Sequence, residues 1–357
     1  MASGDLKLGL NLGYWGIGPA GDDALEVVKA AEAAGFESVW AAESYGSDVV
    51  SVLAWLAGQT TTINLGAAIM QVPARPPAAA AMAGATIDKL SGGRFLFGFG
   101  PSGPQVSEGW YGVPYSKPWG RTREYIEVVR EILAREGPLQ HDDGEHYQLP
   151  LPGGEGKALK LNFHPLRNEI PVFVGAIGRK SVEMAAEICD GWIPIFFSVD
   201  AFEETWGEHL EAGFAAGNRQ RSDLEVSPTL QVAIDGDLEA AKSVVKAGLV
   251  LYFGGMGSRK TNFYVDLAHR FGFGDVADEV QSRFQDGDRG GAFEALPDEI
   301  VEATSLVGTE AQVAERVERF RGAGIDRLIV SPVHVDRAQQ LHTLERLAQL
   351  AGVATPA

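Results

Sequence analysis

The chain has 357 residues, and its 30 Lys and Arg residues against 48 Asp and Glu residues give a formal net charge of −18 at pH 7. A field of that sign repels phosphate backbones and anionic lipid surfaces, so we expect neither a nucleic-acid nor a membrane partner. The single cysteine, Cys189, excludes an internal disulfide, and we expect it to be a packing residue. The sequence has no signal-peptide pattern and no apolar run of membrane-spanning length, so we predict a soluble cytoplasmic protein.

From the N-terminus onward, short apolar runs alternate with longer amphipathic runs. Residues Leu6–Leu12 alternate as a strand does, and residues 22–35 then repeat apolar side chains at helical spacing before a glycine, which makes one β/α unit. The unit recurs, with the later strands expected in FESVWAA, INLGAAIM, RFLFGFG, PVFVGAI, GWIPIF, LEVSPTLQVAI and IDRLIVSP. Eight strands with helical crossovers predict an α/β fold, a (β/α)8 TIM barrel that occupies residues 1–357 as one domain.

Two stretches interrupt this alternation. Residues from about 137 to 168 are rich in Pro, Gly and charge, and they are expected to form an excursion that bears a hairpin. Residues from about 249 to 304 form a second excursion. Both are longer than ordinary connections between elements, so we predict that these insertions form lids or walls of a substrate site.

The stretch VFVGAIGRKS, residues 172–181, passes from a strand into a helix through two glycines. Unpaired amide groups and the positive end of the helix dipole favour an anion at such a junction, and glycine lets the backbone approach it. Arg179 and Lys180 add positive charge. The residues themselves support two interpretations, an anion site over Gly175–Gly178 or a plain turn with two solvated cations.

Three short features have to be weighed against simpler explanations. GFGPSG, at Gly98–Gly103, matches a dinucleotide-binding fingerprint, but Pro104 and further breakers stand where a helix should follow, so a glycine-rich loop that admits a flat ligand is favoured. HDDGEH, at 141–146, has metal-ligand residue types, yet Asp-Asp-Gly is ordinary turn chemistry, and we predict no metal site. His334 lies just beyond the last strand and is either a catalytic residue or a structurally satisfied histidine.

Several of these stretches resemble one family. KLGLNLG, AAGFESVWAAES, the segment from INLGAAIM to GFGPSG, and IPVFVGAIGRKSVEMAAEICDGWIP are similar to the bacterial luciferase-like superfamily, in its deazaflavin-dependent branch. That branch includes methylene-tetrahydromethanopterin reductase and coenzyme F420-dependent dehydrogenases. The resemblance implies a TIM-like barrel, coenzyme F420 across the carboxyl ends of the strands, hydride transfer between the deazaflavin C5 and an organic small-molecule substrate, and a homodimer.

The resemblance also implies positions that bind the cofactor. The bulge at the end of the third strand is expected to hold a non-proline cis peptide between Ala68 and Ile69, with Gln71 contacting the ring or the tail of the cofactor. The ends of the fourth and fifth strands are expected to contact the cofactor through Gly100, Pro101, Ser102, Gly175, Ala176, Ile177, Gly178 and Arg179. The last five of these residues would hold the phosphate-bearing side chain.

The chain departs from the related dehydrogenases at the end of the second strand, where Glu43 and Ser44 replace an Asp-His pair. The usual histidine acid/base is missing, which argues against sugar-phosphate or simple alcohol oxidation. Glu43 remains, and two interpretations of it are open. It is either a catalytic residue that orients the ring or moves a proton, or an ordinary carboxylate before a helix. Two alternatives stay open, an FMN-dependent monooxygenase on the same barrel and a flavin- or deazaflavin-binding protein without turnover.

Overall fold

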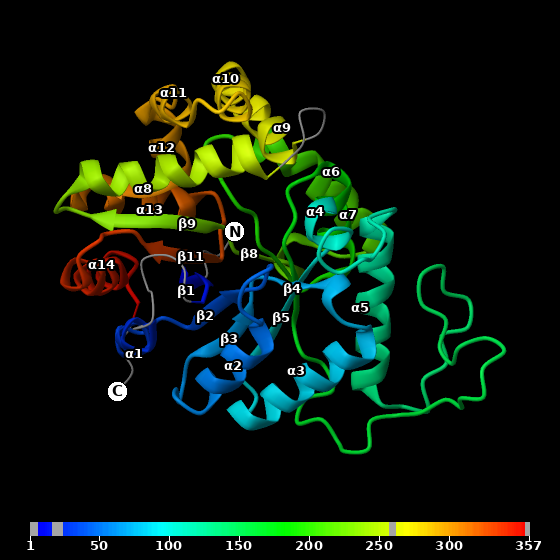
Figure 1. Ribbon diagram of the computed structural model, residues 1–357. Helices are drawn as coiled ribbons and strands as arrows, with labels where there is room; N and C mark the ends of the chain where they lie inside the picture. The colour runs from blue at the N-terminus through cyan, green and yellow to red at the C-terminus, as the bar shows by residue number, and fades with distance from the viewer. Residues whose placement is uncertain (1–5, 16–23, 257–261, 354–357) are drawn as a thin grey trace.

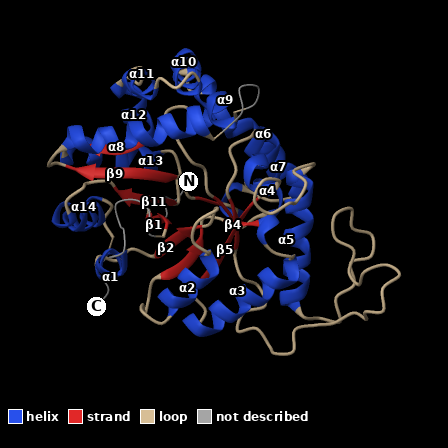
Figure 2. Cartoon of the chain, in the orientation of Figure 1, coloured by secondary structure: helices blue, strands red, loops and turns tan. Residues whose placement is uncertain are grey.

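The computed structural model describes residues 6–15, 24–256 and 262–353. In this part of the chain, the strands form one curled parallel sheet whose outer face is covered by helices (Figures 1 and 2). The strands are β1 (Lys7–Tyr14), β2 (Ser38–Ala42), β3 (Asn64–Ala67), β4 (Met70–Gln71), β5 (Phe95–Gly100), β6 (Val172–Val174), β7 (Gly191–Trp192), β8 (Glu225–Val226), β9 (Thr229–Ile234), β10 (Ser305–Gly308) and β11 (Arg327–Pro332).

The sheet closes into the predicted barrel. Parallel pairing runs in the order β11, β1, β2, β3, β5, β6, β7, β8, and β4 extends the position of β3 by pairing with β5. β8 and β9 belong to one extended segment, 225–234, in which the Thr229 amide donates to the Pro194 carbonyl beyond β7 at 2.9 Å. On the other edge of this segment, the Ile329 amide of β11 donates to the Pro228 carbonyl at 2.9 Å. The segment therefore joins β7 to β11 and completes the ring.

The helices that cover the barrel follow the strands as their apolar spacing predicts. The third of them, α3 (Pro77–Ser91), has proline in its first turn and ends at Gly92, whose φ of 73° lies in the left-handed region that closes many helices. The other covering helices are α1 (Ala24–Ala33), α2 (Val49–Ala57), α5 (Pro118–Ala134), α6 (Arg179–Ile188), α7 (Glu208–Gly217), α8 (Leu238–Val250), α13 (Glu310–Gly322) and α14 (Arg337–Leu350). A four-residue helix, α4 (Pro104–Ser107), follows β5 and is too short for the dinucleotide fold that the sequence disfavours.

The second excursion is helical and packs along α8 (Figure 1). Its apolar side chains form a cluster of their own with those of α8, which includes Leu249, Val280 and Ile300. β10 follows and pairs with β9 outside the barrel ring. The sequence did not predict β10, because a run as short as SLVG cannot be separated from the helical pattern before it. The helices of this excursion are α9 (Phe263–Arg270), α10 (Gly274–Gln285), α11 (Arg289–Glu294) and α12 (Asp298–Thr304).

The first excursion, residues 137–168, extends beyond α5 on the side away from the sheet (Figures 1 and 2). A hairpin was expected in this excursion, and the structure forms one antiparallel β-bridge there, between His141 and Leu149. Because this excursion lies outside the ring of helices, the second excursion is the better candidate for a wall of a site at the barrel mouth.

Two expectations about the whole chain can be compared with the structure. Cys189 is fully buried at the end of α6, and burial raises the pKa of its thiol to about 12, so it packs as a small apolar residue, as predicted. Within the described ranges, no helix combines the length and the apolar composition that a bilayer crossing requires.

A buried ion cluster lies at the amino-terminal end of the barrel strands. The Arg327 side chain is almost fully buried, and its Nε donates to the Glu225 carboxylate at 2.7 Å. Glu37 pairs with the same guanidinium, and the Lys7 ammonium lies 2.8 Å from Glu225. Burial acts to raise the pKa of Glu225, but the charges and hydrogen bonds of Arg327 and Lys7 outweigh it and lower this pKa from 4.5 to about 2.

This shift predicts an acid-sensitive contribution to stability. A carboxylate with a lowered pKa in the folded state contributes its full stabilisation above its unfolded pKa, near 4.5, and loses it as the pH falls towards about 2. We expect Glu225→Gln to cost about 3 kcal/mol at pH 7 and progressively less below pH 4.5. Urea unfolding of both proteins between about pH 7 and pH 3 measures the difference. A difference in unfolding free energy between the two proteins that does not decrease as the pH falls would contradict the lowered pKa of Glu225.

Candidate active site

The structure places the predicted site residues at the carboxyl ends of strands, the end where barrel active sites form. Glu43 follows β2 directly, and His334 follows β11. The other predicted residues are Ala68 and Ile69 between β3 and β4, Gln71 in β4, Gly100 at the end of β5 with Pro101 and Ser102 after it, and Gly175, Ala176, Ile177, Gly178 and Arg179 after β6.

Ile69 joins three of these strand ends. The peptide bond between Ala68 and Ile69 is cis, which confirms the conformation that the resemblance implied. A methyl group added at Gly100 would lie 2.1 Å from the Ile69 side chain, and one added at Gly175 would lie 2.9 Å from it. Glycine at both positions leaves room for the Ile69 side chain, which would have to shift if either residue carried a Cβ.

Glu43 is held in a buried ion pair. Its side chain is only 3% exposed, and both carboxylate oxygens accept hydrogen bonds from the guanidinium of Arg75. One of them also accepts from the backbone amide of Gln71 at 2.9 Å. In addition, the amide of Glu43 donates to the Ile69 carbonyl at 3.2 Å, so the residue binds the bulge from both its backbone and its side chain.

Asp48 continues this network towards the surface. The Arg75 guanidinium forms an ion pair with the Asp48 carboxylate at 3.1 Å, and the Asp48 side chain is about half exposed. Burial of Arg75 acts to lower its pKa, but the hydrogen bond and the charge of Glu43 raise it overall. The sequence did not reveal Arg75 as the partner of Glu43, since the two residues come from different β/α units.

Gln71 and Ser102 connect the bulge to the loop after β5. The Gln71 amide nitrogen donates to the Ser102 hydroxyl at 2.8 Å, and the Tyr115 hydroxyl donates to the Ser102 carbonyl at 3.1 Å. Ser102 has a φ of 62°, an uncommon conformation for a residue other than glycine, Asn or Asp. The Gln71 side-chain oxygen is buried, and no described residue donates a hydrogen bond to it. A polar atom left in this state is available to a ligand.

The loop before α6 has the geometry of an anion site. Gly178 is the residue before the first turn, and no side chain caps the helix there. A methyl group added at Gly178 would make ordinary van der Waals contact with the Ser181 hydroxyl at 3.4 Å, and no other atom of the described residues lies within 4 Å of it. Arg179, which opens the helix, is exposed. The backbone amides of the first turn therefore lie beside the Arg179 cation. In the described part of the chain, no capping side chain accepts a hydrogen bond from them.

Arg270, from α9 in the second excursion, adds a second cation that the sequence did not indicate. Its guanidinium donates to the Ile177 carbonyl at 3.0 Å, and the Trp206 indole donates to the same oxygen at 3.1 Å. The other terminal nitrogen of Arg270 is buried and has no hydrogen-bond partner among the residues that the structure describes. Burial and the nearby charge of Arg179 lower the pKa of Arg270. Two like charges held together in this way favour an anion between them.

His334, the other catalytic candidate, is 2% exposed, and its Nε2 has no hydrogen-bond partner within residues 6–15, 24–256 and 262–353. Its backbone carbonyl accepts from the Gln340 side chain at 2.6 Å, which fixes the turn after β11. The structure gives no contact between His334 and Glu43, so these two candidates do not form a pair within the described part of the chain.

Aromatic hydroxyl groups lie at the same rim, and sequence analysis did not select them. Burial raises the pKa of Tyr14, at the end of β1, against the opposing effect of the Ser44 and Tyr252 side chains. Tyr252 stacks edge to face on Tyr264 with a centroid distance of 4.8 Å, and both residues belong to the second excursion. The position of Tyr14 directly after a predicted strand was the available signal.

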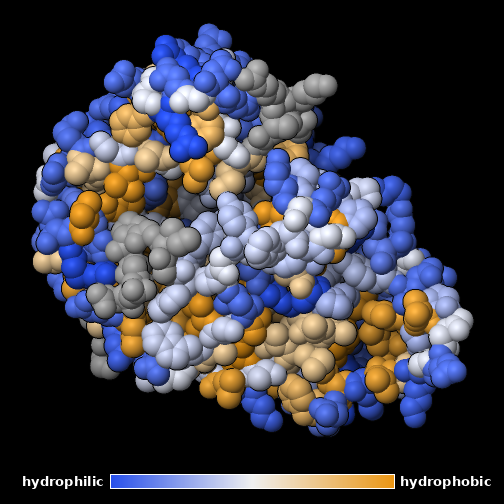
Figure 3. Space-filling model, viewed as in Figure 1, coloured by the Kyte–Doolittle hydropathy of each residue, from blue (hydrophilic) through white to orange (hydrophobic). Residues whose placement is uncertain are grey.

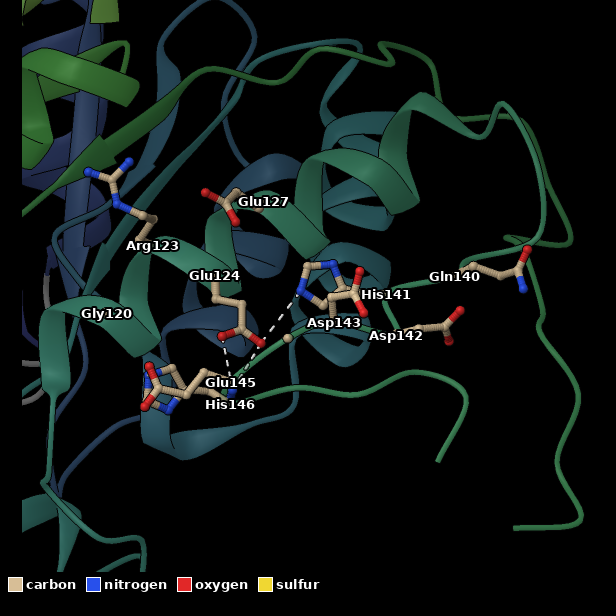
Figure 4. A pocket seen from close by; sticks show the side chains of 11 residues that line it. Gly120, Arg123, Glu124, Glu127, Gln140, His141, Asp142, Asp143, Glu145 and His146 are labelled. Carbon is tan, nitrogen blue, oxygen red and sulfur yellow. Dashed lines mark hydrogen bonds and ion pairs between the residues drawn. The ribbon is translucent and has the colours of Figure 1, made fainter. Parts of the chain in front are cut away.

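A separate recess of about 480 Å³ lies between α5 and the first excursion (Figure 4). HDDGEH lines it, and the Glu124 carboxylate accepts from the backbone amides of His146 and Tyr147 at 2.9 and 2.6 Å. Glu124 therefore holds the turn, as ordinary loop chemistry would predict. Among the residues that the structure describes, no group of three His, Cys, Asp or Glu side chains is arranged to hold a metal ion.

Comparison with known proteins fits this geometry. Residues 10–327 match the model of the luciferase-like monooxygenase family. The chain belongs to that family. A Mycobacterium tuberculosis protein, provisionally named a coenzyme F420-dependent oxidoreductase, is 46% identical to this luciferase-like chain over 95% of it and 99% of the relative. The 5,10-methylenetetrahydromethanopterin reductase of Archaeoglobus fulgidus is 30% identical over 89% of this chain and 92% of the relative.

Solved structures share the fold of this luciferase-like chain. The coenzyme F420-dependent tetrahydromethanopterin reductase of Methanopyrus kandleri superposes with a TM-score of 0.80 over 97% of this chain and 98% of that one, at 24% identity. An F420-dependent secondary alcohol dehydrogenase, solved with an F420-acetone adduct, gives a TM-score of 0.78 over 98% and 99% of the two chains, at 17% identity. Both likenesses support the TIM-like barrel predicted from the sequence.

Proposed function

We propose that the protein is a coenzyme F420-dependent oxidoreductase that transfers a hydride between the deazaflavin C5 and an organic substrate. The observation that carries this proposal is the position of an uncapped, doubly cationic helix start next to the Ile69 bulge on one barrel rim. A ligand with a flat ring and a phosphate-bearing tail matches that pair of features. The names of the two relatives described above, which specify coenzyme F420 or a reductase, support the same choice.

The residues present fit this cofactor. The phosphate would be held by the amides after Gly178 together with Arg179 and Arg270, whose unpartnered nitrogen needs an acceptor. The ring would rest against Ile69, with the polar edge of the ring near Gln71 and Ser102.

The chain's own residues would prepare the reaction. When bound, the deazaflavin supplies or accepts the hydride at C5. Glu43 and Arg75 hold the bulge behind the ring in place, which we propose as a positioning role for Glu43 because both of its oxygens are already bonded. The aromatic side chains of the second excursion would exclude water from the barrel mouth.

A direct test compares two cofactors. The purified protein should bind coenzyme F420 at least about 10-fold more tightly than FMN, since the name of its relative specifies coenzyme F420, and Arg179, Arg270 and the helix amides would hold the phosphate-bearing tail. Fluorescence titration of each cofactor measures this ratio. Tighter binding of FMN would favour a monooxygenase, and binding of F420 without turnover of any hydride acceptor would favour a storage protein.

We also propose that the chain forms a homodimer through α2 and α3. Met82 and Leu90 lie on the outer face of α3 and are 56% and 64% exposed, and Trp55 of the neighbouring α2 is 42% exposed. Figure 3 shows apolar residues over the part of the surface where Figure 1 places these helices. An apolar face of this kind favours association. Light scattering should give twice the chain mass of 38.1 kDa, and a monomer mass would exclude this dimer.

A further inference from the structure

The recess between α5 and the first excursion carries negative charge that the protein does not balance. Glu127 of α5 and Asp142 and Asp143 of the turn line this recess of about 480 Å³. Among the described residues, no cation forms an ion pair with any of these three carboxylates. Arg123 also lines the recess, but its guanidinium donates to both oxygens of the Glu187 carboxylate. The charge of the recess therefore favours a cation from outside the protein.

Two histidines with unused ring nitrogens line the same recess. The side chain of His146 is 9% exposed, and its Nε2 has no hydrogen-bond partner within the described part of the chain. This nitrogen faces the recess wall at Gly120, because a Cβ added there would lie 3.4 Å from it. The Nε2 of His141 is likewise buried without a hydrogen bond to any described residue. A buried polar atom in this state at the wall of a recess is available to a ligand.

Each of these nitrogens lies next to a carboxylate that it does not bond. The His146 Nε2 is 4.0 Å from the Glu145 Oε2, and the His141 Nε2 is 3.5 Å from the Glu124 Oε1. Figure 4 shows the Glu124 carboxylate between the two histidines. An ammonium group has three N–H donors, so it can donate to a histidine nitrogen while the carboxylate beside that nitrogen balances its charge. The recess offers two such positions.

The proton position on His141 also favours a ligand that donates. Its Nδ1 lies 3.4 Å from the Glu131 carboxylate, which favours the ring proton on Nδ1 and leaves Nε2 as an acceptor. A metal ion fits less well, because no three His, Cys, Asp or Glu side chains of the described residues are arranged to hold one. An organic cation with N–H donors matches both the charge and the acceptors.

We propose that this recess binds an aliphatic di- or polyamine, at a site separate from the cofactor site on the barrel rim. One ammonium group would donate to His146 beside the Glu145 carboxylate, and a second would donate to His141 beside the Glu124 carboxylate. The three unpaired carboxylates of the recess would balance any further positive charge. This site lies on the side of α5 away from the sheet, so it does not depend on the proposed function.

The test compares two dications by calorimetric titration of the whole protein. Hexamethylenediamine and hexamethonium have the same carbon chain between their charges, but only the diamine has N–H donors. We expect the diamine to bind at about one per chain and at least about 5-fold more tightly than hexamethonium.

Three variants locate the binding. His146→Phe keeps a ring of similar size but removes Nε2, so it should weaken diamine binding by about 10-fold and leave hexamethonium binding unchanged. Glu127→Gln should weaken both ligands by about 3- to 5-fold, because it removes charge alone. Glu155→Gln is the matched control, since Glu155 is an exposed carboxylate of the same excursion that does not line the recess. It should change neither affinity.

Three results would overturn this inference. Equal affinity for the two dications, or an equal loss in Glu127→Gln and Glu155→Gln, would show only a diffuse attraction to an acidic surface. Zn²⁺ binding that is tighter than diamine binding and is lost in His146→Phe would show a metal site instead. If circular dichroism shows that His146→Phe does not fold, the wild-type preference and the difference between the two glutamate variants still decide, because both glutamates are exposed.

Discussion

Replacing Arg75 with methionine should lower the free energy of unfolding by about 3 to 5 kcal/mol, because the carboxylate of Glu43 would remain buried without its cation. The side chains of Glu43 and Arg75 are 3% and 15% exposed, so water cannot replace the lost partner. Methionine keeps much of the apolar stem of arginine, which restricts the loss to the charge. Urea denaturation at pH 7 gives the difference directly.

The double variant Glu43→Gln with Arg75→Met is the control for this prediction. It removes both charges, so it should recover most of the stability that the single variant loses. Arg179→Met is a second control, since that exposed arginine is not part of the ion pair. A loss below about 1 kcal/mol in Arg75→Met would contradict the description of a buried, mutually dependent pair.

The second large effect concerns cofactor affinity. Arg270→Met should weaken binding of coenzyme F420 by about 10- to 100-fold, because a hydrogen bond to a charged group contributes about 1.5 to 3 kcal/mol. Arg270 also lies over the Trp206 ring at 5.9 Å, a contact that methionine can keep. Lys180→Met is the matched control, because it removes an exposed cation from the next position of the same helix start.

The salt dependence separates this role from a structural one. An anion contact of Arg270 weakens with ionic strength, so the difference between wild type and Arg270→Met should shrink as salt is added. If Arg270→Met binds coenzyme F420 as tightly as Lys180→Met does, Arg270 only holds the Ile177 carbonyl in place and does not contact the cofactor.

The barrel could be predicted from the sequence because each strand and helix carries its own periodic signal. The strand ends followed from the same pattern, which is why Glu43, Gly178 and His334 were placed on one rim. The cis peptide at Ala68–Ile69 was predicted from family resemblance and not from periodicity.

Long-range contacts account for what the sequence did not show. Arg270 and Tyr252 come from the second excursion, whose course across the barrel mouth no local pattern encodes. Arg75 was missed because its pairing with Glu43 joins two units. The reason for glycine at positions 100 and 175 also required the structure, since the Ile69 side chain that fills both spaces comes from another strand.

A crystal structure of the protein with coenzyme F420 tests the central claim most directly. The phosphate should lie within hydrogen-bond distance of the amides after Gly178 and of Arg270, and the deazaflavin ring should rest on Ile69 at the carboxyl ends of the strands. A cofactor bound at the amino-terminal end of the barrel, beside Arg327, or in the recess beside α5, would contradict the claim.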